Sequence, residues 1–278
     1  MQLLVSVVIP NYNNAKYIVE AINSVIRQDY KNFEIVVVDD GSTDNSIEII
    51  EGILFPITLI KSSNYGAGSA RNIGIMASRG EYIALLDSDD IWEKSKLDNQ
   101  MKLMLEQELD LVYCHGEDIG NVVARSKSRP ARYSGDCYPY YKKYPSRSII
   151  ELPCSSSLFR KSVLHKSGLF DINVPPPTED WDFFRRYSRY AKVGFCDEVL
   201  VYYRKHANNI SSRSLVGYYK GNEHAIIKML IDDSAIRFFE RRAIWAKFHL
   251  NSAKFFLKKR MLGNALLAAM KIVMPIMN

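Results

Sequence analysis

Residues 81–90 read Glu81-Tyr82-Ile83-Ala84-Leu85-Leu86-Asp87-Ser88-Asp89-Asp90, an apolar run followed directly by a cluster of acids. The apolar part predicts a buried β-strand, and open α/β sheets bind ligands at the carboxyl ends of their strands. Carboxylates crowded into such a crevice repel one another unless a cation neutralises them, and Mg²⁺ or Mn²⁺ prefers carboxylate, water and phosphate oxygens. The segment therefore predicts an α/β fold with a divalent-metal site. The alternative is that these acids only cap the next helix.

The first hundred residues alternate between strand-like and helix-like patterns. Apolar runs predict strands over residues 5–9, 33–38, 57–61 and 82–86. Helical spacing predicts helices over 15–27, 43–52 and 68–78, the second capped by Ser42 or Thr43. A helix over 94–108 and a strand over 109–114 continue the series. Such alternation is typical of a mostly parallel sheet covered by helices on both faces.

Length and composition suit one large domain with an appendage, since the chain has 278 residues and 47% hydrophobic content. None of the four cysteines forms a Cys-x-x-Cys pair, which argues against a zinc or redox site and favours reduced thiols in a cytoplasmic protein. The strand-like run over residues 3–9 reaches Pro10 too soon for a signal peptide. No apolar stretch of about 18 residues predicts a membrane-spanning helix.

The chain beyond residue 120 is less regular. Residues 121–147 are rich in Arg, Lys, Ser, Tyr and Pro, and they predict a long connection that either binds ligand or is a solvated insertion. Residues 236–259 have helical periodicity, Gly263-Asn264 interrupts it, and residues 265–274 resume it, which predicts a C-terminal helical hairpin. We therefore expect one domain over residues 1–225 and a basic amphipathic helical region over residues 226–278.

The positive charge is concentrated in this tail. Nine of the 37 basic residues but one of the 31 acidic residues lie in residues 234–278, so the remainder of the +6 chain carries a net charge of −2. This distribution argues against nucleic acid as a partner and favours a local anionic surface, such as the inner face of a membrane. The alternative is a hairpin packed on the body with a solvated basic face.

Clusters of polar residues follow three of the predicted strands and open one helix. The first strand ends at Pro10 and Tyr12, the second ends at Asp40, and Arg71 opens the helix that precedes the acidic cluster. Strand ends of a parallel sheet meet at one edge, so an aromatic ring, a carboxylate, a cation and a metal site are expected together. This set matches a nucleoside diphosphate, whose base stacks on Tyr12 and donates an imide N–H to Asp40.

The same segments resemble the family 2 glycosyltransferases. The resemblance covers residues 3–215 and rests on an ordered set of motifs, which are Val5-Ser6-Val7-Val8-Ile9-Pro10-Asn11-Tyr12-Asn13, Val38-Asp39-Asp40-Gly41-Ser42, Ala70-Arg71-Asn72-Ile73-Gly74 and Leu86-Asp87-Ser88-Asp89-Asp90. It implies the GT-A fold and the use of nucleotide-activated sugars. It also implies that Asp40 binds the base, that Asp87 lies near the ribose with Pro10 and Ser88 beside the nucleotide, and that Asp89 binds Mn²⁺ or Mg²⁺.

Two later motifs extend the resemblance. Glu179-Asp180-Trp181 resembles the acidic motif of the family, which implies that Asp180 is the general base and that Glu179 and Trp181 contact the acceptor or the donor sugar. The alternative is that Asp180 only caps its helix. The stretch that ends at His206 resembles a late motif whose His approaches the metal or the diphosphate. The alternative there is a structural histidine.

The expected function is that of an inverting, metal-dependent glycosyltransferase that moves a sugar from a UDP- or dTDP-linked donor to an acceptor hydroxyl. The acceptor is expected to be a glycan or a lipid-linked glycan in cell-surface polysaccharide assembly, with the enzyme cytoplasmic and peripheral on the membrane. One alternative is a sugar-nucleotide nucleotidyltransferase, which needs a Gly- and Arg-rich triphosphate loop that residues 10–16 do not offer. Another is a non-catalytic protein that binds sugar nucleotides.

Overall fold

The computed structural model describes residues 3–120, 133–143, 153–174, 176–206, 209, 215–234 and 236–273. The predicted long connection over residues 121–147 lies outside the described residues except for 133–143, which contain helix α5 (Tyr138–Lys143). Within the described ranges, no helix combines the length and the apolar character that crossing a bilayer requires. All four cysteines are buried free thiols.

Strands and helices alternate through the first half, as predicted. The order is β1 (Val5–Asn11), α1 (Ile18–Ile26), β2 (Phe33–Asp39), α2 (Ser46–Glu51), β3 (Ile57–Lys61), α3 (Ala67–Ala77), β4 (Tyr82–Leu85), β5 (Ile91–Trp92), α4 (Lys96–Glu106) and β6 (Leu111–Ile119). After α5 the chain forms α6 (Pro153–Ser156), β7 (Leu158–Arg160), η1 (Lys161–Val163), α7 (Leu164–Ser167), α8 (Glu179–Tyr187) and β8 (Val193–Arg204). It then ends in α9 (Leu215–Asp232), α10 (Phe238–Lys258) and α11 (Leu262–Lys271).

The strands of the described residues form a single sheet in the order β3-β2-β1-β4-β7-β6-β8-β5. Strands β3, β2, β1 and β4 are parallel neighbours, as are β6 and β8, whereas β7 and β5 run antiparallel to the strands beside them. This arrangement confirms the predicted mostly parallel α/β sheet. It also brings the carboxyl ends of β1, β2 and β4 to one edge, where open sheets of this kind bind ligands.

Alternate side chains of the central strands bury both faces of the sheet. Val5 and Val7 of β1 belong to one core with α1 and α4, whereas Val8 belongs to a second core with α3 and α8. Helix α3 approaches β1 closely because residue 74 is glycine. A Cβ there would lie 2.4 Å from Val8 Cγ1, well inside any real contact. The Gly74 position therefore fixes how α3, which carries Arg71, lies on the sheet.

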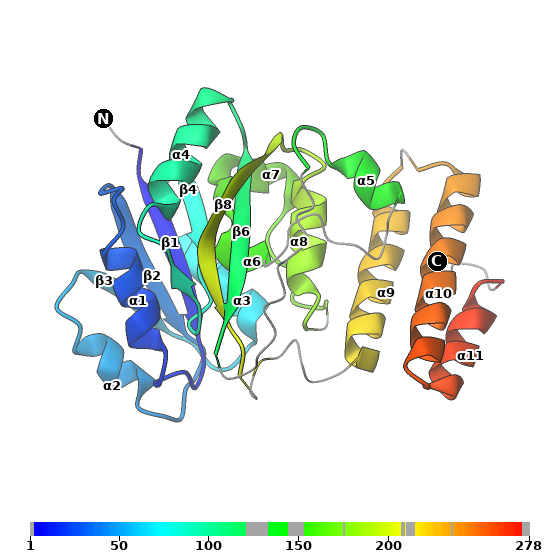
Figure 1. The fold of residues 1–278 in the computed structure, drawn as a ribbon, viewed down its shortest axis with the longest axis horizontal. Coiled ribbons are helices and arrows are strands. Elements are labelled where there is room, and N and C mark those ends of the chain that lie inside the picture. Colours follow the sequence, from blue (N-terminus) through cyan, green and yellow to red (C-terminus); the bar gives the residue numbers. More distant parts are fainter. Residues whose placement is uncertain are drawn as a thin grey trace.

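The C-terminal helices form a separate layer. Figure 1 shows α9, α10 and α11 beyond α8, on the side of the sheet opposite α1. Helices α10 and α11 pack against each other as the predicted hairpin, through buried residues that include Phe256 and Ala268. The expected domain boundary between residues 225 and 226 falls inside α9, which packs on both α8 and α10.

The predicted position of the hairpin turn is wrong. Gly263 and Asn264 lie inside α11, and the turn is formed by residues 259–261. Arg260 adopts a left-handed conformation with φ of 58°, and the Met261 N–H donates to the Phe256 carbonyl at 2.9 Å. This hydrogen bond closes the end of α10 in the manner of a Schellman motif. A left-handed conformation is uncommon for arginine and usual for glycine, so the sequence pattern pointed to Gly263 instead.

Candidate active site

A buried carboxylate, Asp39, ties the ends of β1 and β2 together. It accepts hydrogen bonds from Asn11 Nδ2 at 2.7 Å, from the Ser42 N–H at 2.9 Å and from the Ser42 hydroxyl at 2.7 Å. Gly41 between them has φ of +80°, a conformation that side chains rarely adopt. The Asp-Asp-Gly-Ser stretch is therefore a rigid turn at the edge of the sheet.

The loop after this turn is longer than predicted. The helix expected over residues 43–52 begins at Ser46, because Asn13 Oδ1 accepts the Thr43 N–H at 2.7 Å and Asp44 accepts the Ser46 N–H at 3.0 Å. Asn13 itself has φ of 52°. These hydrogen bonds hold residues 42–45 against the end of β1 and shape the rim beside Tyr12.

Asp40 and Tyr12 lie on this rim. Asp40 is 3% exposed and accepts hydrogen bonds from the Ser62 hydroxyl at 2.9 Å and from the backbone N–H groups of Tyr65 and Gly66 at 3.0 and 2.7 Å. The carboxylate therefore organises the loop that leads into α3. Tyr12 is 45% exposed, so its ring is open to stacking. Two other predicted nucleotide-binding residues lie beneath the rim, since Pro10 is buried inside β1 and Ser88 is buried and accepts from Asn14 Nδ2 at 2.7 Å.

The acids after β4 gather with His206, as expected. Asp89 Oδ2 lies 2.8 Å from His206 Nε2, and the imidazole ring packs on Tyr17 with 5.0 Å between ring centroids. Burial and the negative charge of Asp87 raise the pKa of Asp89. Burial and the charges of Asp89 and Asp87 raise the pKa of Asp90 well above its usual range. Both shifts oppose ionisation of these carboxyl groups, and a cation beside them would favour it.

The chemistry of this cluster fits a divalent cation whose coordination shell is completed by a bound phosphate group and water. No group of three His, Cys, Asp or Glu side chains suited to a metal occurs in the described part of the chain. Asp89 and His206 provide two potential metal ligands, a carboxylate oxygen and an imidazole nitrogen, which lie 2.8 Å apart. Mg²⁺ and Mn²⁺ in phosphate-binding sites commonly take only one or two protein ligands and complete their shell with water and phosphate oxygens. The residues present suit an ion that arrives with a diphosphate.

Arg71 connects the acidic cluster to α8. Its guanidinium lies 2.8 Å from Asp87 Oδ1 and 3.2 Å from Glu179 Oε1, and the side chain is 7% exposed. It also lies 5.5 Å above the Phe170 ring. The predicted nucleotide-binding cation is thus a buried bridge between the end of β4 and the start of α8. Asp87 lies at one end of that bridge and Glu179 at the other.

Asp180 occupies the start of α8 beside this bridge. Its Oδ1 accepts the N–H of Trp181 at 2.6 Å, so the carboxylate does bond to its own helix. Burial, followed by the negative charge of Glu179, raises the pKa of Asp180 to about 7. A carboxyl group with this pKa exchanges protons near neutral pH, which suits a general base. Trp181 is 3% exposed and packs edge-on against Tyr141, so here it supports Asp180 from within the core.

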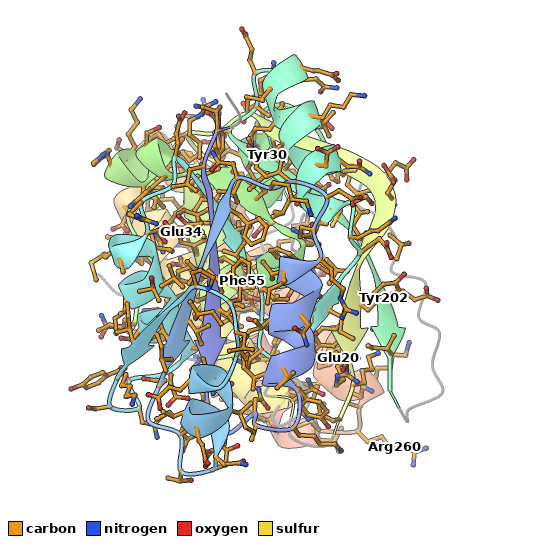
Figure 2. All side chains as sticks on the ribbon, turned by 90° about the vertical axis from the view of Figure 1, so that its left-hand side faces the viewer. Glu20, Tyr30, Glu34, Phe55, Tyr202 and Arg260 are labelled. Atoms are coloured by element: carbon orange, nitrogen blue, oxygen red, sulfur yellow. The ribbon has the colours of Figure 1, made fainter. Side chains whose placement is uncertain are left out.

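Ser155 and Glu20 of the site had no signal in the sequence, whereas Arg204 belongs to the late motif that ends at His206. Ser155 donates its hydroxyl to Asp90 at 2.6 Å and accepts the Asp87 N–H at 3.1 Å. The Arg204 N–H donates to Asp90 at 3.0 Å, and its Nε donates to the Asp89 carbonyl at 2.9 Å. Glu20 lies on the face of α1 towards β8 and pairs with Arg204 (Figure 2). These contacts join segments far apart in the chain, so no local pattern could reveal them.

Comparison with known proteins identifies the family. The family model described as Glycosyl transferase family 2 matches residues 6–168. The chain belongs to this family. An uncharacterized glycosyltransferase of Rickettsia typhi is 34% identical over 219 residues, which are 76% of this chain and 67% of that protein. The glycosyltransferase GlyG of Streptococcus pneumoniae is 39% identical over 129 residues, which cover 44% of this chain and 43% of GlyG.

Solved structures of glycosyltransferases share the fold. A crystal structure of S. aureus TarS superposes with a TM-score of 0.70 at 23% identity, covering 97% of this chain and 80% of that one. A mannosyltransferase from Pyrobaculum calidifontis in complex with GDP-Man and Mn²⁺ gives a TM-score of 0.68 at 20% identity, covering 95% and 73%. These likenesses confirm the GT-A type of fold that the sequence motifs predicted for this family 2 glycosyltransferase.

Proposed function

We propose that this family 2 glycosyltransferase is an inverting enzyme that moves a sugar from a nucleoside diphosphate sugar to an acceptor hydroxyl. The observation that carries the proposal is Asp180 at the start of α8, whose pKa of about 7 suits a base, joined through the Glu179–Arg71–Asp87 bridge to the cluster that holds the Asp89–His206 pair. Asp87 and Glu179 share the Arg71 guanidinium, which links these two parts of the site. In this proposal the part with Asp89 and His206 holds the diphosphate, and the part with Asp180 activates the acceptor.

The donor nucleotide fits the rim formed by the ends of β1 and β2. Its base stacks on the half-exposed Tyr12, and an imide N–H of the base donates to Asp40, which already gathers the N–H groups of Tyr65 and Gly66. Uracil and thymine both carry such an N–H, which favours UDP- or dTDP-sugars. Proteins that share the fold bind both kinds of nucleotide, since TarS has been crystallised with UDP and the mannosyltransferase from Pyrobaculum calidifontis with GDP-Man, and guanine carries an imide N–H as well.

In the transfer step, the acceptor oxygen forms a bond to the anomeric carbon while the bond from that carbon to the diphosphate oxygen breaks. Asp180 takes the proton of the attacking hydroxyl as the bond forms, and general-base help of this kind contributes about 10²- to 10⁴-fold. Asp89 and His206 would hold Mn²⁺ or Mg²⁺, which, when bound, neutralises the charge that develops on the departing diphosphate. Arg71 keeps Asp87 and Glu179 in place on either side of the reacting centre.

The C-terminal hairpin supports a peripheral membrane location on the cytoplasmic side, where lipid-linked glycans would be acceptors in polysaccharide assembly. Leu262, Leu266 and Met270 are exposed at i, i+4 spacing along α11, and they form one apolar stripe that the exposed Val273 follows after the helix ends. The same tail holds the excess positive charge of the chain. An exposed apolar stripe flanked by cations is the pattern of helices that lie on anionic bilayers.

The test is turnover of labelled UDP-, dTDP- and GDP-sugars with Mn²⁺ by the natural chain and by Asp180→Asn. We expect slow release of sugar and nucleoside diphosphate from one donor, and a loss of about 10²-fold or more in the variant with unchanged donor binding. Near-normal turnover by Asp180→Asn would show that Asp180 is not the base. Pyrophosphate-dependent exchange instead of diphosphate release would identify a nucleotidyltransferase, and binding without turnover would identify a non-catalytic protein.

A further inference from the structure

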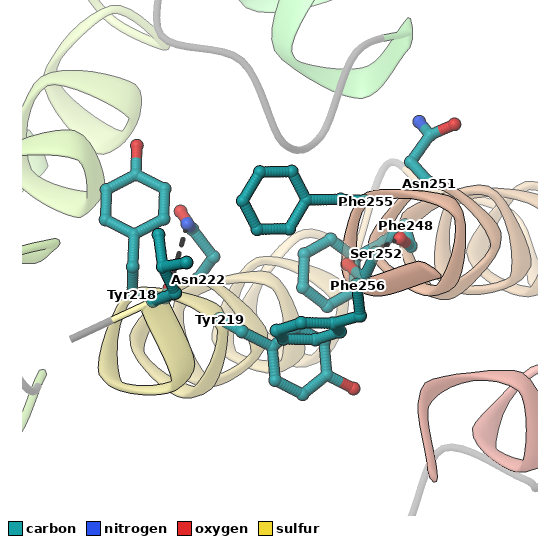
Figure 3. Close-up of a pocket in the computed structure, with 9 residues that line it drawn as sticks. Tyr218, Tyr219, Asn222, Phe248, Asn251, Ser252, Phe255 and Phe256 are labelled. Carbon is teal, nitrogen blue, oxygen red and sulfur yellow. Dashed lines mark hydrogen bonds between the residues drawn. The ribbon is translucent and has the colours of Figure 1, made fainter. Parts of the chain in front are cut away.

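A groove of about 190 Å³ lies between α9 and α10, outside the site described above. Figure 3 shows Phe255 reaching across from α10 towards Tyr218 and Asn222 on α9, with the rings of Tyr219, Phe248 and Phe256 packed below. Pockets for drug-sized ligands are about 300–1,000 Å³, so this groove suits a group the size of a single ring. Its lining residues are Leu215, Tyr218, Tyr219, Asn222, Phe248, Asn251, Ser252, Phe255 and Phe256.

Asn222 has an unsatisfied acceptor at this groove. The residue is 3% exposed, and its Nδ2 donates to the Tyr218 carbonyl at 3.0 Å. Its Oδ1 is buried and has no hydrogen-bond partner in the described structure. In Figure 3 this oxygen lies between the rings of Tyr218 and Phe255. A buried carbonyl without a donor is costly, so the position favours a ligand that brings an O–H or N–H group.

The groove adjoins the base through Tyr218. Helix α9 packs on α8, whose first turn holds Asp180. Burial, followed by the negative charge of Asp180, raises the pKa of Tyr218, so the phenol lies within the electrostatic reach of that carboxylate. A ligand in the groove would therefore extend towards the group that activates the acceptor.

The lining chemistry suits a sugar ring better than an acyl chain. Tyr218 and Phe255 are each nearly half exposed and offer flat apolar faces, while Asn251 and Ser252 add polar groups at the edge. Aromatic faces pack against the C–H face of a pyranose, and its hydroxyl groups need partners such as Asn222 Oδ1. An acyl chain would leave that oxygen unpaired. Leu215 is the one aliphatic side chain among the described lining residues.

We propose that the groove between α9 and α10 is an acceptor subsite that binds a pyranose ring of the glycan, with the ring packed on Phe255 and Tyr218 and a hydroxyl donated to Asn222 Oδ1. This inference rests on the proposed transferase function, because it assigns the ring to the acceptor. The ring could come from a free glycan or from a lipid-linked one, and the chemistry recognised is the same.

The test uses saturation-transfer NMR on the full chain with methyl pyranosides of the common hexoses and N-acetylhexosamines, without donor. We expect ring-proton signals from at least one sugar, lost in Phe255→Ala and in Asn222→Leu. The matched control is Phe239→Ala, since Phe239 is 82% exposed on the same helix and does not line the groove. Phe255 is 43% exposed, so its truncation leaves the core intact and the melting temperature of the variant checks this.

Octyl pyranosides of the same sugars separate the two sources of the ring. Equal Phe255-dependent binding of methyl and octyl forms supports recognition of the ring in a free glycan, and tighter binding of the octyl form with the same ring signals supports a lipid-linked one. Signals from the octyl chain alone would overturn the proposal, as would ring signals that survive Phe255→Ala, or none from any pyranoside.

A second measurement keeps this inference distinct from the proposed function. With the sugar that binds as acceptor, Phe255→Ala should raise the acceptor KM about tenfold, the usual scale for loss of an aromatic contact. Donor KM and the slow hydrolysis of donor without acceptor should stay within about twofold. If the natural chain hydrolyses no donor, the transferase proposal fails by itself. If the natural chain hydrolyses a donor but Phe255→Ala leaves the acceptor KM unchanged, only the proposal of the acceptor subsite is refuted.

Discussion

The raised pKa of Asp180 predicts a specific pH dependence. A general base acts only when deprotonated, and burial with the neighbouring Glu179 charge places the pKa at about 7. Because this pKa is raised, the inactive protonated form persists up to neutral pH and activity is lost as the pH falls. At pH 6 about a tenth of the enzyme carries the active carboxylate, and at pH 8 about nine-tenths does. We therefore expect kcat/KM to fall about tenfold between pH 8 and pH 6.

Glu179→Gln tests the cause of this shift. The substitution removes the charge that opposes ionisation of Asp180 and also frees Arg71 from one of its two carboxylate partners. Both changes favour the carboxylate, so the pKa of Asp180 should drop by about one unit. At pH 6 the variant should then keep about half of its own plateau activity instead of a tenth.

The assay is initial-rate release of nucleoside diphosphate at subsaturating donor between pH 5.5 and 8.5, at constant ionic strength. Glu106→Gln, an exposed change at the end of α4, is the matched control and should follow the natural profile. Titration of the donor phosphates affects all three proteins equally, so the difference between variants isolates Asp180. A profile that is the same for all three, or one that moves to higher pH in Glu179→Gln, would refute the reasoning.

Three further predictions follow from the geometry. Asp89→Asn should abolish most of the Mn²⁺-dependent stabilisation by UDP, which for a ligand at 100 times its Kd is about 2.7 kcal/mol, as measured by thermal shift. Gly74→Ala should destabilise the fold by about 1–3 kcal/mol in urea unfolding because its Cβ would meet Val8, whereas Gly263→Ala, with nothing within 4 Å on α11, should be neutral or stabilising. Leu266→Glu should reduce cosedimentation with anionic vesicles, whereas Leu54→Glu, at a fully exposed position far from the hairpin, should not; equal pelleting of the two variants would refute the membrane proposal.

The sheet and the residues at its rim could be predicted from the sequence because both depend on local patterns. Apolar runs set the strands, and the polar residues that end them had to meet once the strands were parallel. The pairing of Asp89 with His206 was also predictable, although 117 positions separate them, because each belongs to a motif of the family.

The two element boundaries that differ from the prediction have different causes, one a contact between distant segments and the other a local backbone conformation. Helix α2 begins later than predicted because the Thr43 N–H donates to Asn13 Oδ1. The hairpin turn lies before the predicted position because Arg260 adopts a left-handed conformation that glycine usually adopts. The sugar contact predicted for Trp181 stays a prediction; its ring is buried and packs edge-on against Tyr141. Nothing in the tail pointed to Asn222, because an unpaired oxygen becomes visible only when α9 and α10 are packed together.

Arg71 links the proposed donor and acceptor parts of the site. Its planar guanidinium contacts Asp87 and Glu179 through two different nitrogens, a geometry that a lysine ammonium would reproduce poorly. Because the side chain is buried, removing the cation would leave two carboxylates uncompensated beside Asp180 and would make ionisation of the base harder. The strength of the base therefore depends on a residue that the nucleotide motif supplies. This coupling gives a physical reason for an arginine on α3, whose distance from the sheet Gly74 fixes, in an enzyme whose proposed base lies on α8.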